Sequence, residues 1–194
     1  MEKIKLPQVT LIALTNKDFE GHKKAIDKSC EGIEFGAVKI IWDEKCNSID
    51  EWSRKVIYDL PKYIDTEFAL LIHADGYVIN PELWNPEWLE YDFIGAPFPL
   101  PNDDFSYRDE EGTIRRVGNS VSLRSKKLMD RVAQFSWESF HGFWNEDGFI
   151  SVNHVVELEK EGFKYAPMEV AVHFSKEHEI PENVGLSTFC FHSL

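Results

Sequence analysis

The sequence of 194 residues is short of cysteine and of basic residues. It has only three cysteines, Cys30, Cys46 and Cys190, and they lack the paired spacing of a zinc or redox motif. So sparse and odd a set favours reduced thiols in a cytoplasmic protein. Lys and Arg number 21 against 34 Asp and Glu, a formal net charge of −13. Because such a chain repels phosphate backbones and has no basic stripe, we expect no nucleic-acid partner.

Long hydrophobic runs and repeats are also missing. Residues 1–7 contain no apolar run of the kind found in a signal peptide, and the longest nearly unbroken apolar run, residues 68–72, is far too short to cross a bilayer. We therefore expect one compact domain over residues 1–194, without a transmembrane segment and with at most a peripheral association with membranes.

Apolar runs alternate with helical patterns in the first half. Residues 9–14, 38–42 and 68–72 have the composition of buried strands, and residues 18–32 have helical periodicity. Ser48, with Glu51 three residues later, forms a capping box that predicts a second helix ending near Pro61. Alternating strands and helices predict an α/β fold with parallel pairing and right-handed crossovers.

The second half has weaker signals. A strand is expected at residues 92–96, a long loop at 97–112, and helices at 125–132 and 146–160, the second stopped by Gly162. A loop of this length in a compact domain is usually functional or mobile. The pattern after Pro167 is mixed and supports no firm assignment.

The first candidate site follows the third expected strand. His73, Asp75 and Gly76 lie there in a short acid–glycine turn, and ligands of open α/β sheets collect at the carboxyl ends of strands. Asp75 offers oxygen ligands for Mg²⁺ or Mn²⁺, His73 an imidazole better suited to Mn²⁺, and Gly76 allows close backbone approach. The alternative is an ordinary Asp-Gly turn with His73 packed beside it.

The second candidate site is an acid pair at the expected start of a helix. Asn145 is suited to an N-cap, which places Glu146 and Asp147 in the first turn, where the helix dipole favours their ionised forms. An ionised carboxylate suits a general base acting on a sugar hydroxyl. Phe143 and Trp144 could stack on a sugar. The alternative is an acid-rich helix start with core aromatics.

A polar run of small residues, 116–125, is the third candidate. It lacks the spacing of a phosphate-binding loop, but it could line a sugar pocket, and Arg116 or Arg124 could hold a diphosphate or pair with surface acids.

Two weaker candidates remain. Thr15 and Asn16, after the first strand, could contact a nucleotide or cap the next helix. His173, Glu177 and His178 could give a late metal ligand or belong to a solvated tail.

The order of these segments resembles an uncharacterised bacterial family of glycosyltransferase-like domains and, more distantly, the GT-A class of nucleotide-sugar transferases. The resemblance covers most of the chain, and its most specific stretches are residues 68–84, 91–97, 118–125 and 145–147. It implies a single GT-A-like domain with a mixed, mostly parallel central sheet flanked by helices. Residues 1–80 would form a Rossmann-like nucleotide-binding half, 81–177 a donor-sugar and acceptor half, and 178–194 a tail.

The resemblance also implies roles for individual residues. Asp75 takes the place of the last acid of a metal-binding acid-x-acid motif, and His73 replaces the first acid. A third ligand for Mn²⁺ or Mg²⁺ would fall near His173. The inverting base would be Asp147, in preference to Glu146. The nucleotide pocket would include Thr15 and Asn16, and residues 118–125, with Gly118, Asn119 and Ser120, would line the donor-sugar and acceptor pocket. The residues themselves add His73, Asp75, Gly76 and Arg124 as candidates for donor binding and Trp144 and Asn145 as candidates for the acceptor pocket.

The expected activity is metal-dependent transfer of a sugar from a nucleotide diphosphate donor, a UDP-sugar by preference, to a glycan or lipid-linked glycan. Three alternatives stay open: a sugar-nucleotide binding module without catalysis, a nucleotidyltransferase and a structural scaffold. The segment at residues 14–18 lacks the glycine-rich basic loop usual in nucleotidyltransferases.

Overall fold

The computed structural model describes residues 2–137 and 145–193. Five strands form one sheet in the order β2-β1-β3-β5-β4. β1 pairs in parallel with β2 and β3, whereas β5 is antiparallel to both β3 and β4. β5 is therefore the strand that runs against the other four. The strands are β1 (Ile4–Thr15), β2 (Ile33–Trp42), β3 (Phe68–Leu71), β4 (Phe93–Ile94) and β5 (Ser122–Ser125).

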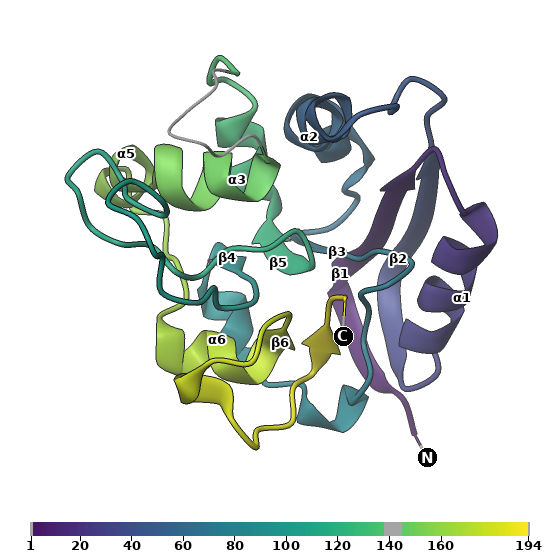
Figure 1. The fold of residues 1–194 in the computed structure, drawn as a ribbon. Coiled ribbons are helices and arrows are strands. Elements are labelled where there is room, and N and C mark those ends of the chain that lie inside the picture. Colours follow the sequence, from purple (N-terminus) through teal and green to yellow (C-terminus); the bar gives the residue numbers. More distant parts are fainter. Residues whose placement is uncertain (1, 138–144, 194) are drawn as a thin grey trace.

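Helices flank this sheet, as expected for a single α/β domain with a mixed, mostly parallel sheet (Figure 1). They are α1 (Phe19–Ser29), α2 (Ile49–Tyr58), α3 (Lys126–Val132), α4 (Glu146–Gly148), α5 (Val155–Lys160) and α6 (Met168–Phe174). A small parallel sheet joins β6 (Ser175–Lys176) to β7 (Cys190–Phe191). None of the helices in the described part of the chain is long and apolar enough to cross a membrane.

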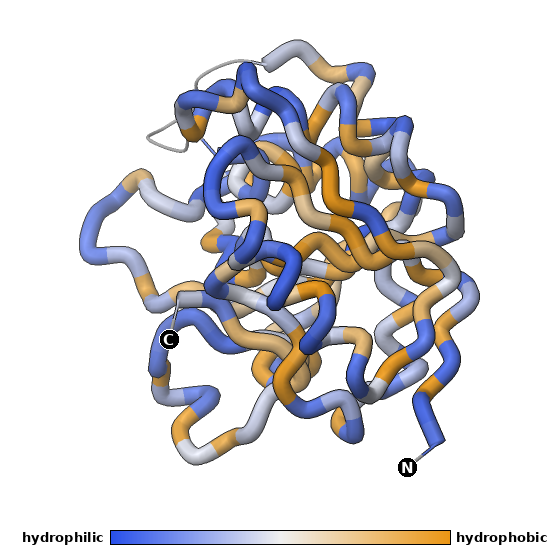
Figure 2. Tube along the Cα trace, turned by 90° about the vertical axis from the view of Figure 1, so that its right-hand side faces the viewer, coloured by the Kyte–Doolittle hydropathy of each residue, from blue (hydrophilic) through white to orange (hydrophobic). Residues whose placement is uncertain are grey.

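Two hydrophobic cores lie on opposite faces of the sheet. Leu11 and Ala13 of β1 belong to the core that includes side chains of α1 and α6, whereas Ile12 and Leu14 belong to the core of α2, α3 and α5. Because successive strand residues point to opposite faces and both faces are covered, the strand reads as a continuous apolar run. Figure 2 shows hydrophobic segments through the middle of the molecule and hydrophilic colour on many outer turns.

The first strand is longer than expected. β1 begins at Ile4 and passes through Pro7, which the sequence pattern marks as its boundary. Pro7 lies where the pairing register with β2 shifts between Leu6 and Thr10. Proline lacks a backbone N–H, and such an irregularity is where a strand tolerates it.

The segment around β5 corrects the expectation of a polar loop. Residues 122–125 form a strand between β3 and β4, and all four are buried. Ser125 then begins α3, and its hydroxyl accepts a hydrogen bond from the N–H of Leu128 over 3.1 Å. Serine and arginine side chains in this strand bond within the protein, so the polar composition hides a buried strand.

The expected helix at residues 146–160 is broken. One turn, α4, leads into a π-helical turn at Phe149–Asn153, and α5 follows. Gly162 after α5 has a φ of 96°, which matches the predicted glycine stop. π-helical turns occur often at functional sites.

Candidate active site

Two adjoining cavities share part of their lining, and the first lies beside the carboxyl ends of β1 and β3. The first, of about 440 Å³, is called the strand-end cavity and the second, of about 380 Å³, the acid cavity. The strand-end cavity is lined by residues after β1 and before α2, among them Thr15, Asn16, Lys17 and Asn47. The acid cavity includes Asn145, Glu146, Asp147 and Glu177. Both are lined by Ile49, Trp52, Ser120 and His192, so the cavities share a wall.

The turn after β3 presents Asp75. The backbone groups of His73 and Gly76 bond to each other in both directions, at 2.8 and 3.3 Å. A Cβ at position 76 would lie 2.6 Å from a methyl group of Val121 and 3.0 Å from the carbonyl oxygen of Phe191, so glycine allows the turn to pack closely. The Asp75 side chain is 66% exposed. The turn therefore presents a carboxylate to solvent.

His73 is held as a neutral ring. Its Nε2 lies 2.8 Å from the hydroxyl oxygen of Ser120. Removal from water, and then the neighbouring His192 and His22, lower the pKa of His73 to about 3. The imidazole is thus uncharged across physiological pH.

The end of the chain brings a second histidine to Asp75. Nε2 of His192 lies 3.7 Å from Oδ1 of Asp75, and its ring stacks on that of His73 with centroids 5.1 Å apart. Ser193 donates hydrogen bonds to Asp75 from its backbone N–H, over 2.8 Å, and from its hydroxyl, over 3.0 Å. These two residues of the expected tail, residues 178–194, therefore pack against the turn after β3.

Opposed effects set the pKa values of this pair. Burial lowers the pKa of His192, but Glu177 and Asp75 outweigh it and raise the pKa above its ordinary value. Burial raises the pKa of Asp75, but the Ser193 hydroxyl and the charge of His192 outweigh it, and the pKa is lowered. The two groups therefore stabilise each other's charged form.

Asp147 is buried at the edge of the acid cavity. Its carboxylate accepts hydrogen bonds from the backbone N–H of Asn119 over 3.1 Å and of Gly148 over 2.9 Å. Burial, followed by the charge of Glu146, raises the pKa of Asp147 to about 7. The expectation of a carboxylate kept ionised by the helix dipole is wrong, because α4 is only three residues long and desolvation dominates.

Glu146 makes a buried ion pair with Arg124. Their side chains are 1% and 0% exposed, and Nη2 of Arg124 lies 2.5 Å from Oε1 of Glu146. The second carboxylate oxygen of Glu146 accepts from the N–H of Asp147 over 2.7 Å. Glu146 is thus neutralised by a buried arginine, whereas the described hydrogen bonds to Asp147 come only from backbone N–H groups, and this difference favours Asp147 as the acid able to act on a ligand.

Arg124 does not reach either cavity. It belongs to β5, donates to the hydroxyl of Ser122 over 2.7 Å and has a completely buried side chain. The structure therefore contradicts its expected contact with a donor diphosphate. Arg116 pairs with Glu182 at 2.7 Å, which agrees with the alternative that it is a partner of a surface acid.

The polar run before β5 reaches the acid cavity in part. Asn119 and Ser120 line it, whereas Gly118 packs against the ring of Phe98 behind the wall. The Asn119 backbone has a φ of 78°, a left-handed conformation that asparagine tolerates. Its amide donates to Oε2 of Glu177 over 2.6 Å.

Comparison with sequence families identifies the chain. A family described as proteins of unknown function, DUF5672, matches residues 52–192. The chain belongs to the DUF5672 family. No curated protein sequence matches it. The matched segment includes Asp75, Asp147 and His192.

The DUF5672 chain shares its fold with a solved enzyme. It is similar to the crystal structure of a glycosyltransferase involved in the glycosylation of the major capsid of PBCV-1. The superposition covers 95% of this chain and 92% of that one, with a TM-score of 0.59 and 12% sequence identity. At this identity the likeness establishes a glycosyltransferase-like fold.

Several residues of the site were not expected from the sequence of this DUF5672 protein. Trp52 reads as a core residue of α2, yet it lines both cavities. Phe98 and Tyr107, from the long loop, stack with ring centroids 4.9 Å apart and line the acid cavity. His192 lies in a segment without a clear pattern. The length of the loop at residues 97–112 and its aromatic residues could have indicated Phe98 and Tyr107 as site residues. No local sequence pattern indicated His192.

The remaining expected site residues are only partly brought together. Thr15 and Asn16 line the strand-end cavity, and Asn145 lines the acid cavity without a side-chain capping bond. His173 lies on α6 in a separate cavity with Trp88, away from Asp75. Trp144, like Phe143, falls outside the described residues.

The candidate metal ligands are two in number. Within residues 2–137 and 145–193, no group of three or more His, Cys, Asp and Glu side chains converges in a way that could hold a metal. Asp75 and His192 nevertheless face each other over 3.7 Å, and the Asp75 carboxylate is open to solvent. Divalent ions at phosphate sites often use one or two protein ligands and complete their shell with substrate oxygens. Asp75 and His192 would give such an ion two donors, and its binding would displace the proton that Glu177 and Asp75 favour on His192.

Proposed function

We propose that this DUF5672 chain is a glycosyltransferase of the GT-A type that moves a sugar from a nucleotide diphosphate donor, a UDP-sugar by preference, to a hydroxyl of a glycan or lipid-linked glycan. One observation carries the proposal. A buried carboxylate, Asp147, with its pKa raised to about 7, lies in a cavity that shares a wall with a second cavity at the strand ends. The glycosyltransferase-like fold supports it.

The strand-end cavity suits the nucleotide. It opens at the carboxyl ends of β1 and β3, where α/β proteins bind such ligands, and is lined by Thr15, Asn16 and Lys17. Lys17 supplies a positive charge for a phosphate, and the two polar side chains can bond to a base or ribose.

The diphosphate would lie toward the shared wall. Asp75 and His192 would hold Mn²⁺ or Mg²⁺ at the edge of this region. When bound, the ion would act as a Lewis acid that offsets negative charge on the departing nucleoside diphosphate.

The acid cavity suits the acceptor. Asp147 takes the proton of the acceptor hydroxyl while the oxygen forms a bond to the anomeric carbon, and the bond from that carbon to the nucleoside diphosphate breaks with its electron pair on the leaving oxygen. Attack from the face opposite the leaving group inverts the configuration. A base with a pKa near 7 is matched to this proton transfer at neutral pH.

The surroundings of Asp147 prepare it for this role. The N–H groups of Asn119 and Gly148 orient the carboxylate, and Phe98 and Tyr107 from the long loop line the cavity. Cys30, Cys46 and Cys190 are free thiols, which supports a cytoplasmic site of action.

A thermal-shift screen tests the proposal. UDP and UDP-sugars with Mn²⁺ should raise the melting temperature, since a ligand at about 100 times its Kd stabilises by about 2.7 kcal/mol. Asp75→Asn should weaken the metal-dependent part of the shift, whereas the control Asp27→Asn, at an exposed side chain of α1, should leave it unchanged. The proposal fails when no nucleotide diphosphate or nucleotide sugar, with or without metal, changes the melting temperature.

The neutral His73 favours a second candidate, a sugar-nucleotide binding module without catalysis. His73 supplies no negative charge at the position where the acid-x-acid motif of the GT-A class has its first acid, so the metal would be held less firmly. Donor hydrolysis and transfer assays separate the candidates, because the module would bind nucleotide sugars and release them uncleaved.

A further inference from the structure

Glu177 is one of the residues that line the acid cavity. It directly follows β6, and three side chains approach its carboxylate. Asn119 donates from Nδ2 to Oε2 over 2.6 Å, Nδ1 of His192 lies 3.3 Å from Oε1, and Nε2 of His178 lies 3.5 Å from Oε2. Contacts on both oxygens fix the orientation of this carboxylate at the cavity wall.

Three carboxylates line the cavity, and one of them, Glu146, is neutralised by the buried Arg124. Glu146, Asp147 and Glu177 contribute carboxylates, and among the described lining residues there is no Lys or Arg. The two lining histidines, His178 and His192, both face Glu177, and His192 also faces Asp75. An anionic ligand in this cavity therefore meets carboxylates whose histidine partners are already engaged.

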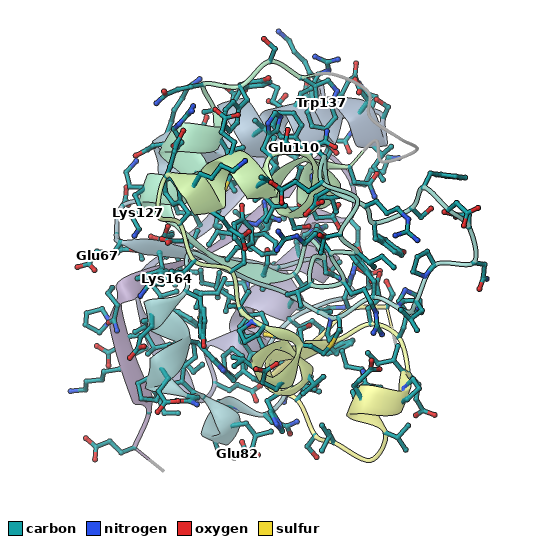
Figure 3. The ribbon with its side chains drawn as sticks, turned by 90° about the vertical axis from the view of Figure 1, so that its left-hand side faces the viewer. Glu67, Glu82, Glu110, Lys127, Trp137 and Lys164 are labelled. Carbon is teal, nitrogen blue, oxygen red and sulfur yellow. The ribbon has the colours of Figure 1, made fainter. Side chains whose placement is uncertain are left out.

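Three arginines of the second half of the chain are paired with acids, and one of these acids, Glu146, is itself a cavity residue. Arg124 is committed to Glu146, Arg115 to Asp109 and Glu159, and Arg116 to Glu182. Figure 3 shows Lys127 and Lys164 together near one edge of the molecule, on the same side as Glu67, and neither lines the acid cavity. Among the described residues that line the acid cavity, no Lys or Arg is thus available to pair with a carboxylate or phosphate on an acceptor.

The same cavity has the features that bind uncharged sugars. Trp52, Phe98 and Tyr107 supply aromatic walls, and Asn119, Ser120 and the Glu177 carboxylate supply a few polar groups. Carboxylates accept hydrogen bonds from hydroxyls, and a pocket of apolar walls with a few placed polar groups selects by orientation.

We propose that Glu177 is a specificity-determining residue that restricts the acceptor to an uncharged sugar and rejects uronic acids and phosphorylated sugars. This inference rests on the proposed glycosyltransferase function. The strand-end cavity, by contrast, is lined by the cation Lys17. The strand-end cavity would therefore bind the anionic donor and the acid cavity the neutral acceptor.

Binding of matched sugar probes tests the inference. The probes are the methyl glycosides of glucose and galactose and the corresponding methyl uronosides, whose dissociation constants are measured by saturation-transfer NMR in the presence of UDP and Mn²⁺. Wild-type protein should bind each neutral glycoside at least about tenfold more tightly than its uronoside, a difference of about 1.4 kcal/mol. Comparable binding of the two probes, or binding of neither, overturns the inference.

Glu177→Gln is the decisive variant, since it keeps the shape and removes the charge. The variant should lower the ratio of the uronoside's dissociation constant to that of the neutral glycoside several-fold, mainly through tighter binding of the uronoside. Glu179→Gln, at an exposed side chain two residues along the chain, is the matched control and should leave the ratio unchanged. An unchanged ratio in Glu177→Gln, with a melting temperature equal to that of wild type, contradicts the assignment.

Transfer assays distinguish a failure of the role of Glu177 from a failure of the proposed transferase activity. Equal transfer to neutral and acidic sugars would overturn the role of Glu177 and leave the transferase intact. Selective binding of neutral glycosides by a protein that never cleaves a nucleotide sugar would overturn the transferase and leave the selectivity of the cavity.

Discussion

The backbone N–H of Asn119 donates a hydrogen bond to Oδ2 of Asp147 across 3.1 Å, which joins the segment before β5 to the acid of α4. Asn119 reaches this position through a left-handed backbone conformation, with φ at 78°. Its side-chain amide holds Glu177. Asn119 thus positions both Asp147 and Glu177 at the acid cavity, through its backbone N–H and its side-chain amide.

The pH dependence of transfer should follow Asp147. The base is its ionised form, so kcat/KM should rise with pH through about 7, where the pKa lies, and level off above it. A pH–rate profile between about 5 and 9 measures this. A profile that is flat across neutrality would remove Asp147 from the proton transfer.

Replacing Asp147 should cost activity and raise stability. Asp147→Asn should lower kcat by about 10²- to 10⁴-fold, the usual worth of a general base, while UDP still raises the melting temperature. The control Asp27→Asn should retain full activity. Full transfer activity in Asp147→Asn would refute the assignment.

The stability gain of Asp147→Asn should depend on pH. Because the folded pKa of Asp147 is raised to about 7, ionisation opposes folding, and the contribution of this group is lost as pH rises through about 7. The variant should therefore exceed wild type in melting temperature at pH 8, and the difference should shrink at pH 5. A difference that is the same at both pH values contradicts the raised pKa.

Arg124→Met should destabilise the fold strongly. It leaves Glu146 buried without its partner, and breaking such a pair costs about 3–5 kcal/mol of unfolding free energy. The control Arg131→Met removes a partly exposed pair with Glu161 and should cost about 1 kcal/mol or less. Urea titration of both variants compares them. Equal losses would contradict the burial of the Arg124–Glu146 pair.

His192→Ala should weaken the metal-dependent binding of UDP. His192 faces Asp75, and the metal-dependent thermal shift should fall by half or more when the imidazole is removed. His178→Ala removes a half-exposed imidazole that faces Glu177 from the other side, and should keep the shift. Should both variants respond to Mn²⁺ and UDP as wild type does, His192 is no ligand.

Gly95→Ala should disturb the site from a distance. An added Cβ would lie 1.7 Å from the carbonyl oxygen of Gly118, which is backbone and can move only with Asn119. We expect a loss of about 1–3 kcal/mol in unfolding free energy and a lower kcat, because the bond from Asn119 to Asp147 shifts. Normal stability with normal kcat would show that the chain relaxes here without strain.

Much of the fold could be predicted from local pattern. The helix α2 begins where Ser48 caps it, and the hydroxyl of Ser48 accepts from the N–H of Glu51 over 3.1 Å as the capping box requires. The acid pair of the site was also predicted, since residues 145–147 have the composition of a helix start. The residues of each of these patterns lie within a few positions of one another, so the patterns can be recognised from the sequence alone.

The sequence by itself determined the α/β order, the turn that carries Asp75 and the helix start that carries Asp147, because strand and helix periodicity, capping and turn residues act over short stretches of chain. Tertiary structure alone decided that residues 122–125 form a buried strand, that Arg124 pairs with Glu146 instead of a ligand, and that His192 and Glu177 return to the site. It also decided the pKa of Asp147. Desolvation and pairing depend on what surrounds a group in space, and those neighbours are far apart along the chain.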